Sequence, residues 1–269
     1  MMYDSFWDRY RLTGSNSMWV VYTALKGTDR MVAPSLRGCY GGHDHDKTVF
    51  ERACLVNQIG SDLDRTCWIH QVHGSNIRMF TLKQNLGEGA YRVGARQADV
   101  MITNIPGAVL ALRFADCPPL LVRAVASDGR VWVLAAHCGT LGLINRLPIV
   151  AMERLCRLAH VTPRDLDIWI GPMISLKHYQ FDHQSSRDQI KIQAFESCNA
   201  VRWISNRPHL GVQLMLEYQL VEFGVDLQRV TIEGICTCDN PWMWSFRGAL
   251  YETGSGFNRD DNVVMIKCQ

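Results

Sequence analysis

The sequence lacks an apolar run of the roughly 18 residues that a membrane-spanning helix needs. Its charge is nearly balanced, because 28 Lys and Arg residues against 26 Asp and Glu residues leave a net charge of +2. A protein that binds a nucleic-acid polymer through bulk charge needs a basic face, so this balance argues against that class. A small basic pocket for one phosphate group remains compatible with it.

An apolar leader and two nucleotide-binding motifs are also missing. Residues 1–11 have no apolar stretch of the secretory kind. No G-x-x-x-x-G-K-[ST] loop or strand-linked G-x-G-x-x-G occurs, which excludes a P-loop and a Rossmann site. The ten cysteines lie mostly within apolar runs. We therefore expect a cytoplasmic protein away from membranes, with mostly buried free thiols.

The hydrophobic pattern predicts strands and helices along most of the chain. Two adjacent prolines interrupt its longest apolar segment, since proline cannot donate a hydrogen bond to a sheet. A glycine-rich, polar stretch predicts a long loop over 26–46. The predicted strands are 19–25, 66–74, 76–82, 97–104, 107–125, 130–139, 166–172, 229–237 and 244–248, and the predicted helices are 47–60, 147–160 and 210–225.

Several predicted strands follow one another across turns, while others alternate with helices. This pattern is typical of α/β or α+β proteins with mixed sheets. No linker-like stretch divides the chain. We expect one domain over residues 1–269, with layered mixed β-sheets flanked by helices.

Three reactive side chains stand at or just past the ends of apolar strands: His73, Cys117 and His137. Ligand sites of α/β sheets gather at the edge where strands end. If these strands are neighbours, two imidazoles and a thiolate converge, which suits catalytic zinc with one open position. The same residues permit a metal-free mechanism, in which Cys117 is a nucleophile activated by a histidine that Asp116 or Gln71 orients.

Other candidates are weaker. His70 lies three residues before His73, and on a strand that offset points them to opposite faces, so we do not expect both as ligands. Cys236 and Cys238 stand closer together than the C-x₂-C pair that chelates zinc comfortably, so we expect structural cysteines. Four basic residues are candidates for holding an anionic group. These are Lys26, Arg37, Arg52 and Arg247.

Five segments, in this order, resemble the YfiH-like family, which is also named for polyphenol oxidoreductase, laccase-domain or peptidoglycan-editing proteins. The resemblance runs from about residue 20 to about residue 260. The segments are HQVHGSNI (70–77), ADCPPLL (115–121), AAHCGTLGL (135–143), IGPMIS (170–175) and GICTCDNPWMWSFRG (234–248).

The resemblance implies a single α/β domain and a metal site, usually taken as zinc, at His73, Cys117 and His137. It further implies phosphorolysis of adenosine, inosine and methylthioadenosine, and deamination of adenosine. Some members are instead linked to editing peptidoglycan precursors. The copper label of the family is less fitting, because a multicopper oxidase needs many more histidines.

The chain departs from the family pattern where arginines are expected. The family motif A-H-A-G-W-R-G reads AHCGTLG over 136–142, and T-G-R reads TGS over 253–255. Lost arginines weaken the case for phosphate binding. We take Gln71, Arg37 and Arg247 as candidate substrate-binding residues.

Three hypotheses follow from the sequence. The leading one is a zinc-dependent enzyme acting on purine nucleosides, with His73, Cys117 and His137 as metal-binding and catalytic residues. Its partners would be a nucleoside and phosphate, with no nucleic-acid polymer. The second is a metal-free Cys–His hydrolase or amidase that edits a peptidoglycan precursor. The third is a non-enzymatic binding protein, which the missing arginines motivate.

Overall fold

A sheet of six strands forms the centre of the structure, in the order β12-β9-β7-β8-β5-β4. The computed structural model describes residues 10–15, 18–23, 45–57, 59–87, 97–241, 243–254 and 262–269. β7 pairs antiparallel with both β8 and β9, whereas β5 and β4 run parallel, so the sheet is mixed. Its strands are β4 (Ile77–Phe80), β5 (Val100–Thr103), β7 (Pro119–Val125), β8 (Val131–His137), β9 (Asp167–Ile170) and β12 (Val230–Ile232).

A second sheet of five strands packs against the first, in the order β1-β2-β13-β6-β3. Alternate residues of its strands face opposite sides, as the two-residue period of a strand requires. Leu110 and Val264 pack against Leu121 and Val133 of the six-stranded sheet. The strands are β1 (Tyr10–Ser15), β2 (Met18–Thr23), β3 (Thr66–Trp68), β6 (Val109–Phe114) and β13 (Asn262–Lys267).

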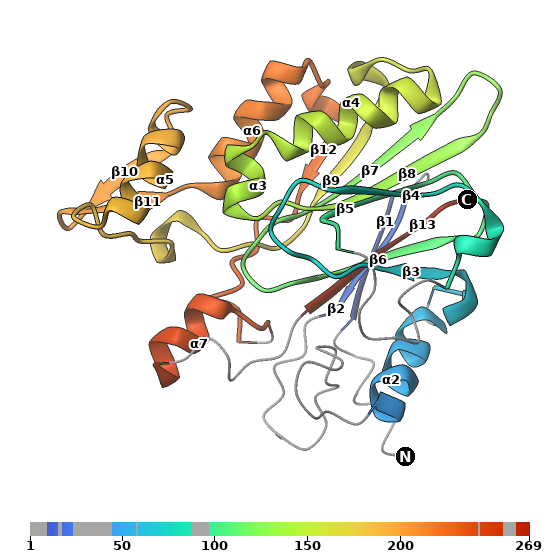
Figure 1. Cartoon of the computed structure of the whole chain (residues 1–269), viewed down its shortest axis with the longest axis horizontal. Helices are drawn as coiled ribbons and strands as arrows, with labels where there is room; N and C mark the ends of the chain where they lie inside the picture. Colours follow the sequence, from blue (N-terminus) through green and yellow to red (C-terminus); the bar gives the residue numbers. More distant parts are fainter. Residues whose placement is uncertain are drawn as a thin grey trace.

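Helices cover the outer faces of both sheets, which gives four layers (Figure 1). α4 (Leu147–Ala159) and α6 (Val212–Phe223) bury an apolar side each against the six-stranded sheet. α4 begins with a proline in its first turn, and α6 ends at Gly224 with a left-handed φ of 86°. α2 (His45–Asn57) packs on the five-stranded sheet.

Shorter elements extend beyond these layers (Figure 1). The hairpin of β10 and β11 lies beside α5, and α7 lies at the end of the five-stranded sheet in that view. Their bounds are α3 (Thr140–Ile144), α5 (Ser186–Glu196), β10 (Val201–Ile204), β11 (Arg207–Leu210) and α7 (Phe246–Thr253). Short 3₁₀ turns span Leu63–Arg65, Lys83–Asn85, Pro163–Asp165, Leu176–His178 and Leu227–Arg229.

Most predicted elements are confirmed, and four predictions need correction. The strands over 66–74 and 229–237 end early, at Trp68 and Ile232, because the chain then leaves the sheet. The strand over 244–248 is wrong. There the side chain of Ser245 accepts a hydrogen bond from the N–H of Gly248, which caps the helix α7 instead. The loop over 26–46 lies outside the described residues except for its last two, which begin α2.

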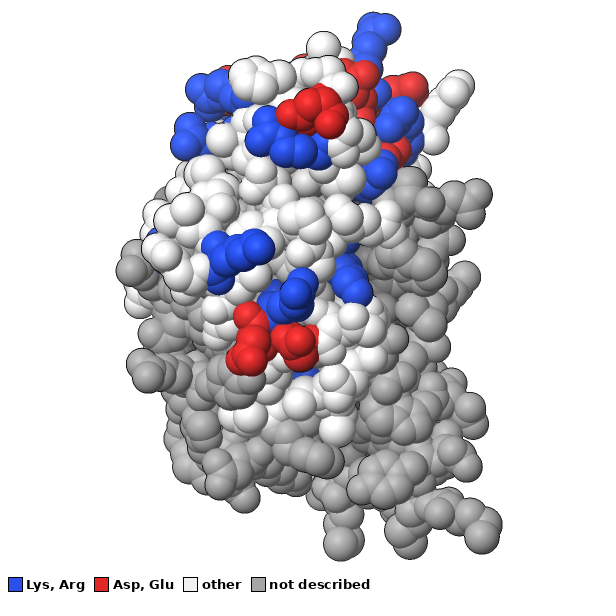
Figure 2. All heavy atoms as spheres, turned by 90° about the vertical axis from the view of Figure 1, so that its right-hand side faces the viewer, with Lys and Arg blue, Asp and Glu red and all other residues white. Residues whose placement is uncertain are grey.

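The interruption at the two prolines is confirmed, since Pro119 is the first residue of β7 and Pro118 precedes the strand. The nine described cysteines are all free thiols, and four of them are buried: Cys67, Cys138, Cys156 and Cys268. No helix of the described residues is both long and apolar enough to cross a membrane. On the face drawn in Figure 2, the basic side chains of the described residues form small groups that acidic side chains interrupt.

Leu134 of β8 tests how far the interface between the six-stranded sheet and α4 stabilises the protein. The side chain is fully buried in the core that β7, β8, α4 and α6 share. We expect Leu134→Ala to lower the free energy of unfolding by about 2 to 5 kcal/mol, because it removes apolar contacts and leaves a cavity. Urea denaturation followed by circular dichroism measures this. The matched Leu227→Ala, at a side chain that is 55% exposed, should change it by less than about 0.5 kcal/mol.

Candidate functional site

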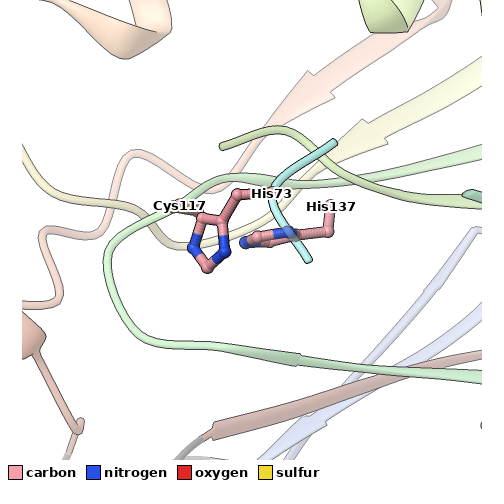
Figure 3. Close-up of side chains that lie close together, drawn as sticks. All are labelled: His73, Cys117 and His137. Atoms are coloured by element: carbon pink, nitrogen blue, oxygen red, sulfur yellow. The ribbon is translucent and has the colours of Figure 1, made fainter. Parts of the chain in front are cut away.

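The structure brings His73, Cys117 and His137 together. One ligand atom from each lies within 4.8 Å of the others. Figure 3 shows the two imidazoles approaching each other, and their rings meet edge to face at 4.7 Å. His73 is exposed, Cys117 is partly buried and His137 is buried, so the group opens to solvent on the side of His73. His70 is not part of this group and instead forms an isolated bridge with Gln97.

Two crossings between the sheets position these residues. His73 lies in the segment that leads from β3 of one sheet to β4 of the other, and Cys117 lies in the segment from β6 to β7. β3 and β6 are parallel neighbours, so both crossings leave the five-stranded sheet at the same edge. His137 arrives differently. It ends β8 opposite Pro119, the first residue of the antiparallel β7.

Asp99 fixes the two histidines. Its Oδ1 accepts hydrogen bonds from the backbone N–H of His73 and from Nδ1 of His137, both at 2.9 Å. Its Oδ2 accepts from the backbone N–H groups of Gly74 at 2.7 Å and Val72 at 3.3 Å. The residue is fully buried. Burial alone raises the pKa of this carboxyl. The hydrogen bond to His137 and the backbone donors outweigh this effect and bring the pKa below its ordinary value, so Asp99 is ionised.

Sequence reasoning missed Asp99. The signal was present, because it is an acidic residue in an otherwise apolar predicted strand, 97–104, and a buried charge needs partners. Asp99, and not the predicted Asp116 or Gln71, is thus the residue that accepts the hydrogen bond of His137. Asp116 accepts from the hydroxyl of Thr237 and from backbone N–H of Arg247.

The thiol and the buried imidazole shift each other's protonation. Burial alone raises the pKa of Cys117, but the charge and hydrogen bond of His137, with His73, lower it to about 6. Burial alone lowers the pKa of His137, but the Cys117 thiolate and the hydrogen bond that His137 donates to Asp99 raise it to about 9. The protein groups alone thus form a thiolate–imidazolium pair near neutral pH.

A glycine keeps the space among the three side chains open. A Cβ atom on Gly139 would lie 3.0 Å from Cδ2 of His73, 3.4 Å from Cε1 of His137 and 3.6 Å from Sγ of Cys117. Any side chain at position 139 would therefore enter the volume that His73, Cys117 and His137 enclose. The backbone also bends sharply, because His73 and Asp116 have φ angles of 58° and 108°, which non-glycine residues rarely adopt.

Arg247 is the one candidate for anion binding that the described structure places near this group. Its guanidinium carbon lies 5.0 Å from the ring centroids of both Tyr179 and Phe181. The hydroxyl of Tyr179 shares a short hydrogen bond with Thr140, and burial, with the nearby Cys117 charge, raises its pKa to about 12.

The other basic and polar candidates lie elsewhere or are engaged. Lys26 and Arg37 lie outside the described residues. The guanidinium of Arg52 stacks on Trp68 at 4.7 Å. The side-chain amide of Gln71 donates to the carbonyl and accepts from the N–H of the same residue of β6, Arg113. Gln71 therefore ties its crossing to the five-stranded sheet, which leaves its substrate-binding role a prediction.

Comparison with known proteins identifies the family to which this chain belongs. Residues 20–258 match the family described as multi-copper polyphenol oxidoreductase laccase. The chain belongs to this family. The resemblance drawn from the sequence is therefore confirmed, and the identities below make the chain a distant member of the laccase-domain family.

Relatives within the laccase-domain family carry the name purine nucleoside phosphorylase. The YlmD protein of Geobacillus stearothermophilus is 28% identical over 223 residues, 81% of this chain and 79% of its own. YlmD of Bacillus subtilis is 24% identical over 220 residues, 80% of this chain and 78% of its own.

Solved structures share the fold over nearly the whole chain. YfiH of Bacillus licheniformis superposes with a TM-score of 0.78 at 20% identity and covers 98% of this chain and 100% of its own. YlmD of Geobacillus stearothermophilus gives the same TM-score at 23% identity and covers 97% and 99%. The prediction of an α/β domain with mixed sheets and flanking helices is confirmed.

The pKa of Cys117 predicts how its alkylation depends on pH. In protein treated with a chelator, the thiolate is present above about pH 6, so its iodoacetamide reaction should rise through pH 6 and fall away below it. Mass spectrometry of the labelled peptide measures the rate. Removing the imidazole in His137→Asn should move the midpoint to higher pH. Cys138 is a control, because burial raises the pKa of this thiol far above the range tested. A Cys117 midpoint unchanged in His137→Asn would contradict the pairing.

Proposed function

We propose that the chain is a zinc-dependent enzyme that acts on purine nucleosides, with zinc held by His73, Cys117 and His137. The convergence of these three donors within 4.8 Å carries the proposal. Two imidazoles and a thiolate match a catalytic zinc site, in which three protein ligands leave one position for substrate or water. The names of the relatives supply the substrate class.

The surroundings of the donors fit a bound metal ion. Asp99 accepts a hydrogen bond from Nδ1 of His137, which turns Nε2 toward the other donors, as carboxylates do for histidine ligands in metal sites. Gly139 leaves the enclosed volume open. When bound, zinc supplies a Lewis acid that polarises a substrate atom or acidifies a water molecule.

Arg247 supports phosphorolysis over deamination. Its backbone N–H bonds to Asp116, the neighbour of Cys117, and two aromatic rings hold its guanidinium. Among the described residues its side chain donates one hydrogen bond, from Nη1 to the carbonyl of Gln180 at 3.3 Å. The remaining donors suit the oxygens of a phosphate. Arg247 thus takes the role of the arginines that the family motifs lead one to expect.

Tyr179 lies beside Arg247 and forms, with it, a wall next to His73, Cys117 and His137. Because its pKa is about 12, the hydroxyl keeps its proton at neutral pH and holds Thr140, the first residue of α3. Its ring positions Arg247 by cation–π contact. Together these contacts orient an anion beside the three donors.

A metal-free cysteine hydrolase or amidase is the second candidate. One observation favours it: Cys117, His137 and Asp99 follow the order of nucleophile, base and orienting carboxylate. Zinc analysis of the purified protein separates the two. One equivalent of zinc that is lost in His73→Ala supports the metal site, whereas full activity of chelator-treated protein supports the cysteine mechanism.

The activity is tested with adenosine, inosine and methylthioadenosine, each with and without phosphate, and products are separated by chromatography. We expect free purine base that requires phosphate. Arg247→Ala should raise the KM for phosphate about 10- to 100-fold, the loss of one charge-assisted hydrogen bond. Arg157→Ala, at an exposed arginine of α4, serves as control.

Other product patterns would redirect the proposal. Inosine formed from adenosine without phosphate would assign deamination. Product no higher than in Cys117→Ala would remove the nucleoside activity and favour the non-enzymatic binding protein.

Asp99→Asn tests the orienting carboxylate. The substitution keeps the size of the side chain but turns an amide toward backbone N–H groups and Nδ1 of His137. We expect the zinc affinity to fall about 10- to 100-fold, as for other lost partners of metal-binding histidines. Competition with a chromophoric chelator measures it. Asp128→Asn, at an exposed turn residue that bonds to Arg130, should leave the affinity unchanged.

A further inference from the structure

A second group of residues of the types that bind metal ions lies apart from His73, Cys117 and His137 in the sequence. Nε2 or Nδ1 of His178, Sγ of Cys236 and a carboxylate oxygen of Asp239 lie within 4.8 Å of one another. We propose that this group binds a second zinc ion. The inference does not depend on the proposed nucleoside chemistry, because it concerns other residues.

The donor types match zinc. Imidazole, thiolate and carboxylate are the three ligands that zinc takes in proteins, and thiolate disfavours magnesium and calcium. The backbone N–H of Ser175 donates to Sγ of Cys236 at 3.3 Å. The sulfur is thus held in place by a backbone contact.

The distances leave room for an ion after a small adjustment. His178 Nε2 and Asp239 Oδ1 are 2.6 Å apart, joined by one proton. Zinc bonds of about 2.0 to 2.3 Å place tetrahedral donor atoms about 3 to 4 Å apart. An ion that replaces the shared proton therefore moves the two groups apart by roughly 1 Å. The carboxylate can yield, because the side chain of Asp239 is 48% exposed.

Backbone contacts hold the two contributing segments against each other. Met173 and Cys236 form a parallel bridge, in which the N–H of Met173 donates to Ile235 and that of Thr237 donates to Met173. The carbonyl of His178 accepts from the hydroxyl of Tyr251 at 2.8 Å. The ligands are therefore preorganised, which lowers the entropy cost of binding an ion.

A surface ion pair is the simpler explanation of the His178–Asp239 contact. Lys177 shares the same carboxylate, with Nζ 3.3 Å from Oδ1 of Asp239. Such exposed pairs contribute about 0 to 1 kcal/mol. An ion pair does not account for a third donor, the sulfur of Cys236, at the same point. Lys177 is 72% exposed and can turn into solvent when a cation binds.

The second ion would stabilise the wall of the first site. His178 precedes Tyr179, whose ring contacts Arg247 and whose hydroxyl bonds to Thr140. Cys236 precedes Thr237, whose hydroxyl donates to Asp116 at 2.6 Å. We therefore assign the ion a structural role, in which it ties the two segments that carry these contacts.

The full chain, with any affinity tag removed, is analysed for zinc by mass spectrometry. We expect two equivalents in the unchanged protein. Asp239→Asn and His178→Ala should each leave one equivalent, and so should His73→Ala, while His178→Ala with His73→Ala should leave none. His183→Ala, at an exposed histidine outside both groups, should retain two.

Cobalt in place of zinc tests whether Cys236 supplies the sulfur ligand of the second site. In Cys117→Ala, added cobalt should give a thiolate-to-metal absorption band in the near ultraviolet, which disappears when Cys236→Ser is added. Circular dichroism checks that each variant is folded, and the exposed position of Asp239 makes its isosteric variant the safest. Lys177→Ala should bind the second zinc several-fold more tightly, because a positive charge is removed from the carboxylate.

Two results would overturn the second site. One is a single equivalent of zinc that His73→Ala removes and Asp239→Asn leaves in place. The other is a cobalt band in Cys117→Ala that persists after Cys236→Ser. Neither result touches the first site, whose zinc is counted separately.

Discussion

The carboxylate of Asp99 is the contact on which the site depends. It is a buried charge, and it is tolerated because four donors surround it: three backbone N–H groups and the imidazole of His137. The backbone donors hold the crossing at the left-handed conformation of His73, and the imidazole bond sets which nitrogen of His137 faces Cys117. The side chain of Asp99, the residue directly before β5, thus bonds to residues of two other segments.

The four-layered arrangement explains why these segments meet. Both crossings leave the five-stranded sheet beside each other and enter the six-stranded sheet, while β8 ends next to the start of β7. Apolar side chains of the two sheets pack against each other, and each crossing is anchored by a strand at both of its ends. Arg247 and Tyr179 then add a cationic, aromatic wall from the following segments.

Much of the fold and the convergence of His73, Cys117 and His137 could be predicted from sequence, since apolar periodicity marks strands and reactive residues at strand ends are visible. The rule from which their convergence is predicted applies to only two of the three residues. The parallel-sheet rule holds for His73 and Cys117, but His137 comes from an antiparallel strand of another sheet. The strand β13, the helix α5 and the cap at Ser245 went unrecognised, because tertiary contacts decide them. The spacing of Cys236 and Cys238 in the sequence does not connect Cys236 with His178, 58 residues upstream, although their potential ligand atoms lie within 4.8 Å of each other.

The placement of the donors across two sheets has a consequence for the order of folding. Neither sheet alone contains the site. Asp99 directly precedes β5 and His137 ends β8, both of the six-stranded sheet, while the crossings to His73 and Cys117 begin in the five-stranded sheet. Before the two sheets dock, His73, Cys117 and His137 would be far apart. If these residues hold zinc as proposed, tight binding would require the docked state, and the bound ion would in turn slow the separation of the two sheets.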